Sequence, residues 1–472
     1  MELLFESRLD VKWKSGKVNV VQGRAEIDPE PVLVGDSPVD GASVSIYGSV
    51  LRDGGRFRMW YQAYPKDWDR GSNSAWVCYA ESDNGLDWKK PALGIVDYGG
   101  GPSNLCNLGV HSPSVFIDPE APPSHRYRAT GCVDPGKPGN HAGLEKSGYY
   151  TFHSADGLHW EADDSAPTWD SVDVITSVYH PWQQRGIVAM KFNPMVRGFM
   201  RRVIYNAELR DGRWSPAHPA LIPDEFDDVC AIARGYSTGD YYGMGMLPAG
   251  SGTAGMIWQF RHRLPRAPLA SGQFGNVDIS LAYQSGPRAC WEHQSGRSDF
   301  ISSASQHWTR GGIYSASCPV EVGDEHWLYI TGSSHSHAWS RGADGERIEK
   351  AAEEAVEEGH SRIGLARWPK WRLFGFEADP EGDLTFEAQA PNVPSDLYLN
   401  YKCEPGGHID MHITDNKGGH FFDRAKTLTG DGTETKVVWE NNALHGPAVG
   451  QTLWMQLNLY RAGVYAYELR PV

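Results

Sequence analysis

Ser82-Asp83-Asn84-Gly85-Leu86-Asp87-Trp88 decides the fold, because the chain repeats it as Ser154-Ala155-Asp156-Gly157-Leu158-His159-Trp160. Shorter echoes follow at 211–214 and 285–291, and each ends in Trp. An Asn-Gly or Asp-Gly pair is typical of a tight turn between strands, since Gly readily takes a positive φ. Each Trp would then lie early on the next strand and fill the gap between neighbouring sheets. Repeats of this length match one four-stranded propeller blade, so the pattern predicts a radial array of β-sheets.

Five such units can be laid out along the chain, each opening with a strand that should line a central axis. They begin near Asp40, His111, Asp173, Asp228 and Tyr314. One segment departs from the β pattern, because apolar residues recur at helical spacing between Asp344 and Gly359. We therefore expect a five-bladed β-propeller over residues 1–390, with a helical insertion near 344–359.

Beyond residue 390 the hydrophobic pattern changes to strict alternation. Leu397, Leu399 and Tyr401 share one face, and 409–413 and 453–459 alternate in the same way. A period of two is typical of half-buried strands in an antiparallel sheet. The sequence therefore predicts an all-β fold in which a small β-sandwich over 391–472 follows the propeller.

Composition narrows the possible partners. The net charge is −15 and the pI is about 5.6, which argues against nucleic acid, whose binding depends on clustered Lys and Arg. The 18 Trp, 21 Tyr and 15 Phe residues suit wide packed sheets or the stacking of sugar rings. No stretch reaches the ~20 apolar residues of a membrane span, and the first residues lack the pattern of a signal peptide. We expect a cytoplasmic address if this is the native start, with no membrane partner, and the oligomeric state stays open.

The expected site lies at one mouth of the propeller channel, where the innermost strands of all blades converge. Asp40, Asp173 and Asp228 stand at or just before such strands. Paired carboxylates suit glycoside hydrolysis, because one donates a proton to the leaving oxygen while another attacks or activates water. We therefore predict these three as the catalytic residues. The alternative for each is that its carboxylate only stabilises a turn.

Further residues are predicted to contact the substrate. His111 opens the second unit, His335 and His337 lie close together in the fifth, and Trp182 lies on an expected loop where it could stack on a sugar face. The histidines leave open a metal-assisted lyase or hydrolase, although two ligands are too few for a specific site. We expect no metal and no cofactor.

The order of several motifs resembles that of bacterial proteins described as similar to the N-terminal domain of glycoside hydrolase family 32, within the five-bladed superfamily that includes family 43. The matching segments are Arg58–Gln62, Tyr79–Trp88, Val115–Asp118, Ile363–Arg367 and Leu397–Asn400. The resemblance implies a five-bladed propeller followed by a β-sandwich, with a sugar-processing pocket on the propeller axis. Asp40 stands where these families place the acid of the first blade. The Arg-Asp-Pro and Glu-Cys-Pro motifs are absent, and His111 opens the second blade instead.

The sequence therefore favours a glycoside hydrolase that cleaves a glycosidic bond of an oligosaccharide or glycoside. A small-molecule carbohydrate is the expected partner, and a cytoplasmic address favours exo action. The alternatives are a non-catalytic carbohydrate-binding propeller and the metal-assisted lyase or hydrolase. The sequence leaves the sugar, the linkage and the anomeric outcome open.

Overall fold

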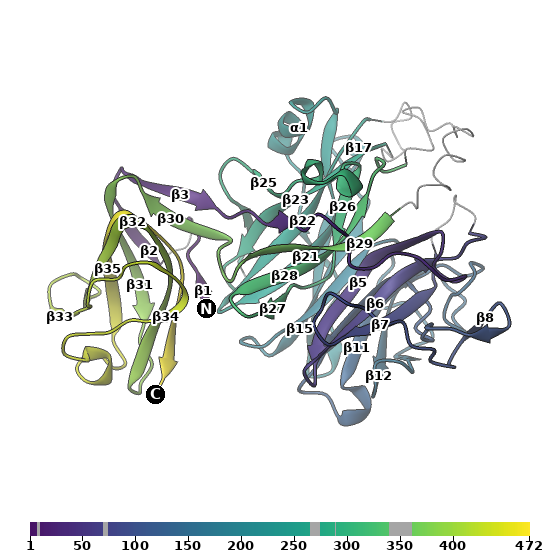
Figure 1. The fold of residues 1–472 in the computed structure, drawn as a ribbon, viewed down its shortest axis with the longest axis horizontal. Coiled ribbons are helices and arrows are strands. Elements are labelled where there is room, and N and C mark those ends of the chain that lie inside the picture. Colours follow the sequence, from purple (N-terminus) through teal and green to yellow (C-terminus); the bar gives the residue numbers. More distant parts are fainter. Residues whose placement is uncertain (7–9, 69–73, 265–273, 288, 339–360) are drawn as a thin grey trace.

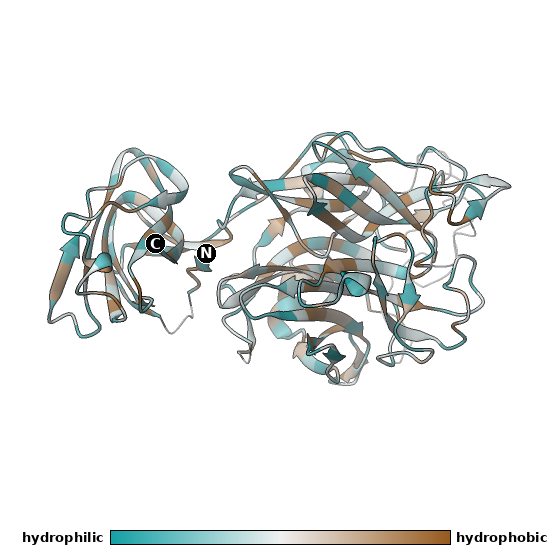
Figure 2. Ribbon diagram, turned by 90° about the horizontal axis from the view of Figure 1, so that it is seen from below, coloured by the Kyte–Doolittle hydropathy of each residue, from teal (hydrophilic) through white to brown (hydrophobic). Residues whose placement is uncertain are grey.

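The computed structural model describes residues 1–6, 10–68, 74–264, 274–287, 289–338 and 361–472. The helical insertion expected near 344–359 lies outside these residues. The described chain forms a five-bladed β-propeller beside a second β unit built around the C-terminus (Figure 1). Figure 2 shows the two units side by side, with brown hydrophobic stretches in the sheets of both.

Each blade is an antiparallel sheet whose first strand is innermost. Blade 1 holds β5 (Ser43–Asp53), β6 (Arg56–Tyr64) and β7 (Val77–Ser82). Blade 2 holds β10 (His111–Ile117), β11 (Tyr127–Val133), β12 (Gly148–Ser154) and β13 (Glu161–Ala162). Blade 3 holds β14 (Ile175–His180), β15 (Arg185–Phe192), β18 (Val203–Arg210), β19 (Arg213–Trp214) and β20 (His218–Leu221). The small hairpins β8 (Asp97–Tyr98) with β9 (Gly101–Pro102), and β16 (Met195–Val196) with β17 (Phe199–Met200), lie on connections.

Blades 4 and 5 complete the ring. Blade 4 holds β21 (Thr238–Ala249), β22 (Gly252–His262), β23 (Gly275–Gln284), β24 (Trp291–His293) and β25 (Asp299–Ile301). Blade 5 holds β26 (Gly312–Ser315), β27 (Val320–Val322), β28 (Glu325–Ser333) and β29 (Ser361–Pro369), and its outer strand is β4 (Glu26–Ile27) from the N-terminal segment. The 3₁₀ turns are η1 (Pro123–His125), η2 (Ser303–Ser305), η3 (His307–Thr309) and η4 (Ala443–His445).

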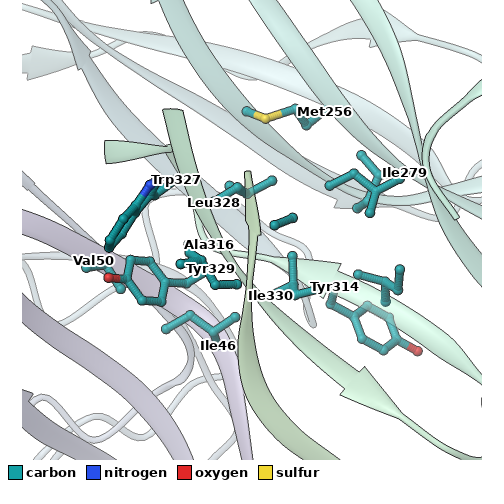
Figure 3. Packing of buried hydrophobic residues seen from close by; sticks show 14 of the residues in the cluster. Ile46, Val50, Met256, Ile279, Tyr314, Ala316, Trp327, Leu328, Tyr329 and Ile330 are labelled. Carbon is teal, nitrogen blue, oxygen red and sulfur yellow. The ribbon is translucent and has the colours of Figure 1, made fainter. Parts of the chain in front are cut away.

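The ring closes between blades 5 and 1. The Thr331 hydroxyl accepts a hydrogen bond of 2.6 Å from the backbone amide of Ile46. Ile46 and Val50 of β5 pack with Leu328 and Ile330 of β28 in one buried cluster (Figure 3). β4, which precedes blade 1 in sequence, also pairs with β29, the last strand of blade 5 in sequence. The last blade therefore contains strands from both ends of the propeller sequence, and this closes the ring around a common axis.

The repeated heptads form nearly identical loops. The Ser82 hydroxyl accepts from the amide of Gly85 at 2.9 Å, and the Ser154 hydroxyl accepts from that of Gly157 at the same distance. Both glycines have φ of 78°, as the turn prediction required. The loops are longer than two-residue hairpin turns, however. In each loop, the side chain of Asn84 or Asp156 accepts hydrogen bonds from the backbone amides two and three residues later. The echo at 211–214 is a two-residue turn with positive φ at both central positions.

The tryptophans that end these four repeats are directed toward the preceding blade. Trp88 packs edge-on against Tyr329 of blade 5, with ring centres 5.6 Å apart, and the indole of Trp291 donates to Asn206 of blade 3. Trp214 lies 5.3 Å from Trp169, which follows blade 2. In the loop of Trp160, the carbonyl of Gly157 accepts from the Trp60 indole of blade 1. The predicted role of these residues between neighbouring sheets is confirmed, but Trp88 and Trp160 lie in loops, whereas the sequence predicts them on the next strand.

The C-terminal unit is one nine-stranded sheet. Its strands are β32 (Ser395–Asp415), β33 (Phe421–Arg424), β34 (Asp431–Lys436), β35 (Thr452–Pro471), β30 (Phe374–Ala378), β31 (Glu381–Gln389), β1 (Glu2–Leu3), β2 (Val11–Lys14) and β3 (Val18–Gln22). The pairing of β32 with β35 shifts register between Cys403 and His408, and the sheet curves around its own core (Figure 1). The sheet therefore takes in strands on both sides of residue 391 and three strands from the N-terminus. The alternation at 397–401 and 409–413 has its apolar side buried, as predicted.

One α-helix, α1 (Glu225–Ile232), lies within the described residues and was not expected from the sequence. Asp224 caps it, and Asp227 bonds back to the amide of Asp224, which completes a capping box. Asp228 therefore lies on a helix that precedes the inner strand β21, and not on a strand. In the described part of the chain, no helix combines the length and apolar character needed to span a membrane.

Candidate functional site

A cavity of about 390 Å³ opens where the inner strands of the propeller begin. His111 from β10, Asp173 just before β14 and Tyr242 from β21 reach it from three blades. The remaining described residues that line it are Ser74, Ala75, Cys132, Asp134, Lys137, Asn140, Ser147, Val172, Lys191, Asn193 and Arg202. We call this the axial cavity, and its volume lies within the range of pockets for small ligands, ~300–1,000 Å³.

Asp173 is the acidic side chain most firmly fixed in the axial cavity. Its carboxylate forms an ion pair with the ammonium of Lys191, and its other oxygen lies 3.4 Å from Nε2 of His111. Burial alone would raise the pKa of Asp173, but the charge of Lys191 and the hydrogen bond and charge of His111 lower this pKa well below its usual range. Asp173 is therefore an ionised carboxylate.

The backbone at Asp173 is unusual. Its φ is 99°, a value that residues other than Gly rarely adopt. Ser112, next to His111, has φ of 58°. Such conformations cost of order 1–3 kcal/mol each and persist only where surrounding contacts hold them, commonly at functional sites. One outlier is therefore Asp173 itself, and the other directly follows His111, which contacts Asp173 in the axial cavity.

Tyrosines from several blades surround Asp173. Tyr47 of β5 packs edge-on against Tyr314 of β26, with ring centres 5.0 Å apart, and Tyr314 packs against Tyr242 at 5.6 Å. Burial raises the pKa of Tyr47, Tyr64, Tyr242 and Tyr314, and the negative charge of Asp173 raises it further in each case. Their hydroxyls stay protonated, so they are neutral hydrogen-bond donors beside an anion.

His111 links blade 1, blade 2 and Asp173. Its ring lies 5.5 Å from that of Tyr47, and its Nδ1 lies 3.3 Å from the carbonyl oxygen of Ser74. Both ring nitrogens thus face an oxygen that accepts hydrogen bonds. His111 therefore connects the carbonyl of Ser74 to the carboxylate of Asp173.

Asp40 is not among the described residues that line the axial cavity. Its carboxylate is completely buried and accepts hydrogen bonds from Ser37, Tyr61 at 2.9 Å and Lys90 at 2.7 Å. Burial alone would raise the pKa of Asp40, yet the hydrogen bond and charge of Lys90, with Ser37, lower this pKa. These contacts fix the turn that leads into β5.

Asp228 is likewise not among the described residues that line the axial cavity. It accepts from the guanidinium of Arg201 at 2.9 Å, from the Thr238 hydroxyl and from the amide of Gly239. The carboxylate therefore connects α1 to the start of β21. Of the three acids expected from the sequence, Asp173 is the one that the structure places in the cavity.

The residues expected to contact the substrate do not all lie near the axial cavity. His337 lies next to the cavity, since its Nε2 is 3.2 Å from the hydroxyl of Tyr242. Nδ1 of His335 lies 3.0 Å from the Ser334 hydroxyl, and His335 does not line the cavity. Trp182 lies in the turn between β14 and β15, which is the end of that hairpin opposite to Asp173. The structure thus brings His111 and His337, but not Trp182, toward Asp173.

Several cavity residues escaped the sequence prediction. Tyr242 lines the cavity, and Tyr314 packs against Tyr242 and against Tyr47. All three lie on the first strands of their units, so the same geometric rule would have found them had it considered tyrosines besides acids and histidines. Lys191 lies on β15, the second strand of blade 3, and Arg202 directly precedes β18, the third. No pattern in the sequence indicates that these two positions face the axis. Asp134 follows β11 and lies in a Gly-rich and Pro-rich loop.

Within the ranges that the structure describes, no group of three or more His, Cys, Asp or Glu side chains is arranged to hold a metal ion.

No protein-family model matches the chain, and no curated protein matches it. Among solved structures it is similar to BT0996 in an RGII complex, with 13% identity over 73% of this chain and 93% of that protein and a TM-score of 0.48. A glycosyl hydrolase from Bacteroides ovatus is 12% identical over 76% of this chain and 97% of its own, with a TM-score of 0.45. An exo-inulinase from Aspergillus awamori is 11% identical over 94% and 99%, with a TM-score of 0.42.

Proposed function

We propose that this protein hydrolyses a glycosidic bond in the axial cavity and that Asp173 is its central catalytic carboxylate. The observation that carries the proposal is an ionised, partly buried Asp at the wall of a cavity of ligand size, held by Lys191 and His111 with a strained backbone. An anion fixed in this way can attack the anomeric carbon or stabilise the positive charge that develops there.

A second carboxyl group is available in the same cavity. Asp134 lines it, contacts the ammonium of Lys137 at 2.7 Å and lies 3.4 Å from the Ser147 hydroxyl. Its side chain is half exposed, so proton exchange with water is open to it. We assign Asp134 as the partner that exchanges a proton with the leaving oxygen or with water, in place of Asp40 and Asp228.

The shape of the site suits a terminal sugar. The cavity accepts a small ligand, and neutral phenols and amides such as Tyr242, Asn140 and Asn193 offer hydrogen bonds to hydroxyl groups. This supports exo action on an oligosaccharide or a simple glycoside. The distance between the two carboxyl groups in a sugar complex would decide between retention, at about 5–5.5 Å, and inversion, at about 6.5–9.5 Å.

A non-catalytic carbohydrate-binding propeller is the second candidate, and one observation favours it. Both oxygens of Asp173 are already engaged, by Lys191 and by His111, as expected if the acid only shapes the cavity. In that case sugars bind but no glycoside is turned over.

Turnover on a panel of aryl furanosides and pyranosides tests the proposal. We expect the parent protein to cleave at least one, with Asp173→Asn and Asp134→Asn lowering kcat by about 10²–10⁴-fold. Asp228→Asn is the matched control, because Asp228 is also a propeller acid paired with a cation, here Arg201, but does not line the cavity. Near-parental rates for Asp173→Asn would contradict the proposal, and sugar binding without turnover in the parent would favour the binding protein.

A further inference from the structure

Arg202 is an unusual wall residue of the axial cavity. It is only 3% exposed, yet its Nε and Nη1 atoms have no hydrogen-bond partner in the described structure. The guanidinium carbon lies 4.8 Å from the ring centre of Phe260 and 5.4 Å from that of Tyr242. A planar cation held between aromatic rings is oriented without using up its hydrogen-bond donors.

The nearest acid does not satisfy this guanidinium. Nη1 of Arg202 lies 3.5 Å from an oxygen of Asp240, too long for a strong charge-assisted hydrogen bond. Asp240 already accepts from Nε of Arg201 at 2.6 Å and from Nε2 of His262 at 2.9 Å. Asp240 thus accepts mainly from Arg201 and His262, and Arg202 has the longest contact with this carboxylate.

The cavity itself has a surplus of cations. Asp134 pairs with Lys137 and Asp173 pairs with Lys191, so Arg202 has no acid among the other described lining residues. Burial lowers the pKa of Lys191 while Asp173 raises it, and the charge of Arg202 lowers it again, so the two cations repel each other. An anion bound between Lys191 and Arg202 would relieve this repulsion and accept hydrogen bonds from the guanidinium of Arg202.

We propose that the axial cavity recognises a carboxylate or phosphate group on its sugar ligand, and that Arg202 binds this group with Lys191 beside it. The assignment rests on the proposed function for the sugar part of the ligand. An arginine can hold either group through two parallel hydrogen bonds, which gives both affinity and a fixed orientation. Arg202 is thus a specificity residue, separate from the bond cleavage assigned to Asp173.

Binding of matched sugars by calorimetry tests the proposal without requiring turnover. The probes are methyl β-D-glucuronide against methyl β-D-glucoside, methyl α-D-galacturonide against methyl α-D-galactoside, and inorganic phosphate. We expect at least one acidic sugar to bind roughly tenfold or more tighter than its neutral partner, or phosphate to bind in the cavity. A preference for the acidic sugar identifies a carboxylate, and binding of phosphate with no such preference identifies a phosphate group.

Two variants assign the effect to Arg202. Arg202→Gln should abolish the preference for the anion, so that acidic and neutral sugars bind alike, while Arg202→Lys should keep part of the preference. Thermal unfolding shows whether both variants are folded. If Arg202→Gln does not fold, the selectivity of the parent protein for acidic sugars or phosphate still tests the proposal. Equal binding of acidic and neutral sugars with no phosphate binding overturns the proposal, as does an anion preference that survives in folded Arg202→Gln. Anion selectivity without turnover of any glycoside would refute the hydrolase and leave this inference intact.

Discussion

His111 and Asp173 meet at the propeller axis, where Nε2 of the histidine lies 3.4 Å from a carboxylate oxygen. The two residues open different blades, and the backbone of Asp173 and that of Ser112, next to His111, lie in a region of φ that non-glycine residues seldom use. The convergence of strand starts at one mouth thus creates a contact that neither blade could form alone. This contact gives the site an anion held in place by an imidazole from another blade.

Replacement of His111 by Gln should change how activity depends on pH. His111 helps to lower the pKa of Asp173, so its loss should raise that pKa. If the ionised form is the active one, the acidic limb of the pH–rate profile moves to higher pH and kcat falls at low pH. The profile of kcat/KM measures the shift. His218→Gln, at an exposed position of blade 3, is the control. An acidic limb that stays in place would contradict the role of His111.

The repeated loops should tolerate no side chain at their glycines. A Cβ at Gly85 would lie 2.7 Å from the hydroxyl of Tyr329, in addition to the cost of positive φ. Gly212 has a similar φ of 71° but open space around it, which makes Gly212→Ala the matched control. We expect Gly85→Ala to lower the free energy of unfolding by about 1–3 kcal/mol more than the control does. Denaturant titration measures both, and equal losses would show that the loop does not lock blade 1 onto blade 5.

Much of the fold was predictable because its signals are local. The heptads, their glycines and the Trp spacing are visible in sequence, and His111 was placed at the first residue of β10. The extent of the C-terminal sheet was not predictable, since β1, β2 and β3 pair with strands more than 350 residues away in sequence. Such long-range pairing leaves no periodic trace that distinguishes a strand of one sheet from a strand of another.

The candidate site was predictable only in part. The rule that sites lie at the starts of inner strands led to Asp173 and His111, which line the cavity. The same rule led to Asp40 and Asp228, whose partners Lys90 and Arg201 hold them in structural networks. Whether an acid near a strand start faces the axis or a neighbouring cation depends on tertiary contacts. These contacts are not encoded in the spacing of the acids.

Asp40→Asn should therefore affect stability and not chemistry. The amide cannot serve as the acceptor for Lys90, Tyr61 and Ser37 together, and it removes one of the two carboxylates that pair with Lys90, the other being Asp36. We expect a loss of about 1–3 kcal/mol in the free energy of unfolding, with kcat of the folded variant unchanged. Chemical denaturation and steady-state kinetics check the two parts. A large fall in kcat with unchanged stability would place Asp40 in the catalytic machinery after all.

His326 should make stability depend on pH. Burial, with the charges of Lys370 and the N-terminus, lowers the pKa of His326 to about 3. The unfolded chain binds a proton near pH 6.5 and the folded chain does not, so stability is full above that value and is lost as the pH falls. Between pH 7 and 5 this group should account for about 2 kcal/mol of lost stability.

The variant His326→Phe isolates this contribution. It cannot be protonated, and its ring can still pack between Trp368 and Trp371. Free energies of unfolding at pH 7 and pH 5 should differ less for the variant than for the parent. The same slope in both proteins would show that His326 is not the buried neutral group responsible.

The central claim is that residues from different blades form one sugar site around Asp173. A crystal structure of the Asp173→Asn variant soaked with the best aryl glycoside tests it most directly. We predict a sugar ring in the axial cavity, with its anomeric carbon facing residue 173 and its hydroxyls against His111 and Tyr242. A sugar bound only elsewhere on the molecule, or lying in the cavity with its anomeric carbon turned away from residue 173, would contradict the account.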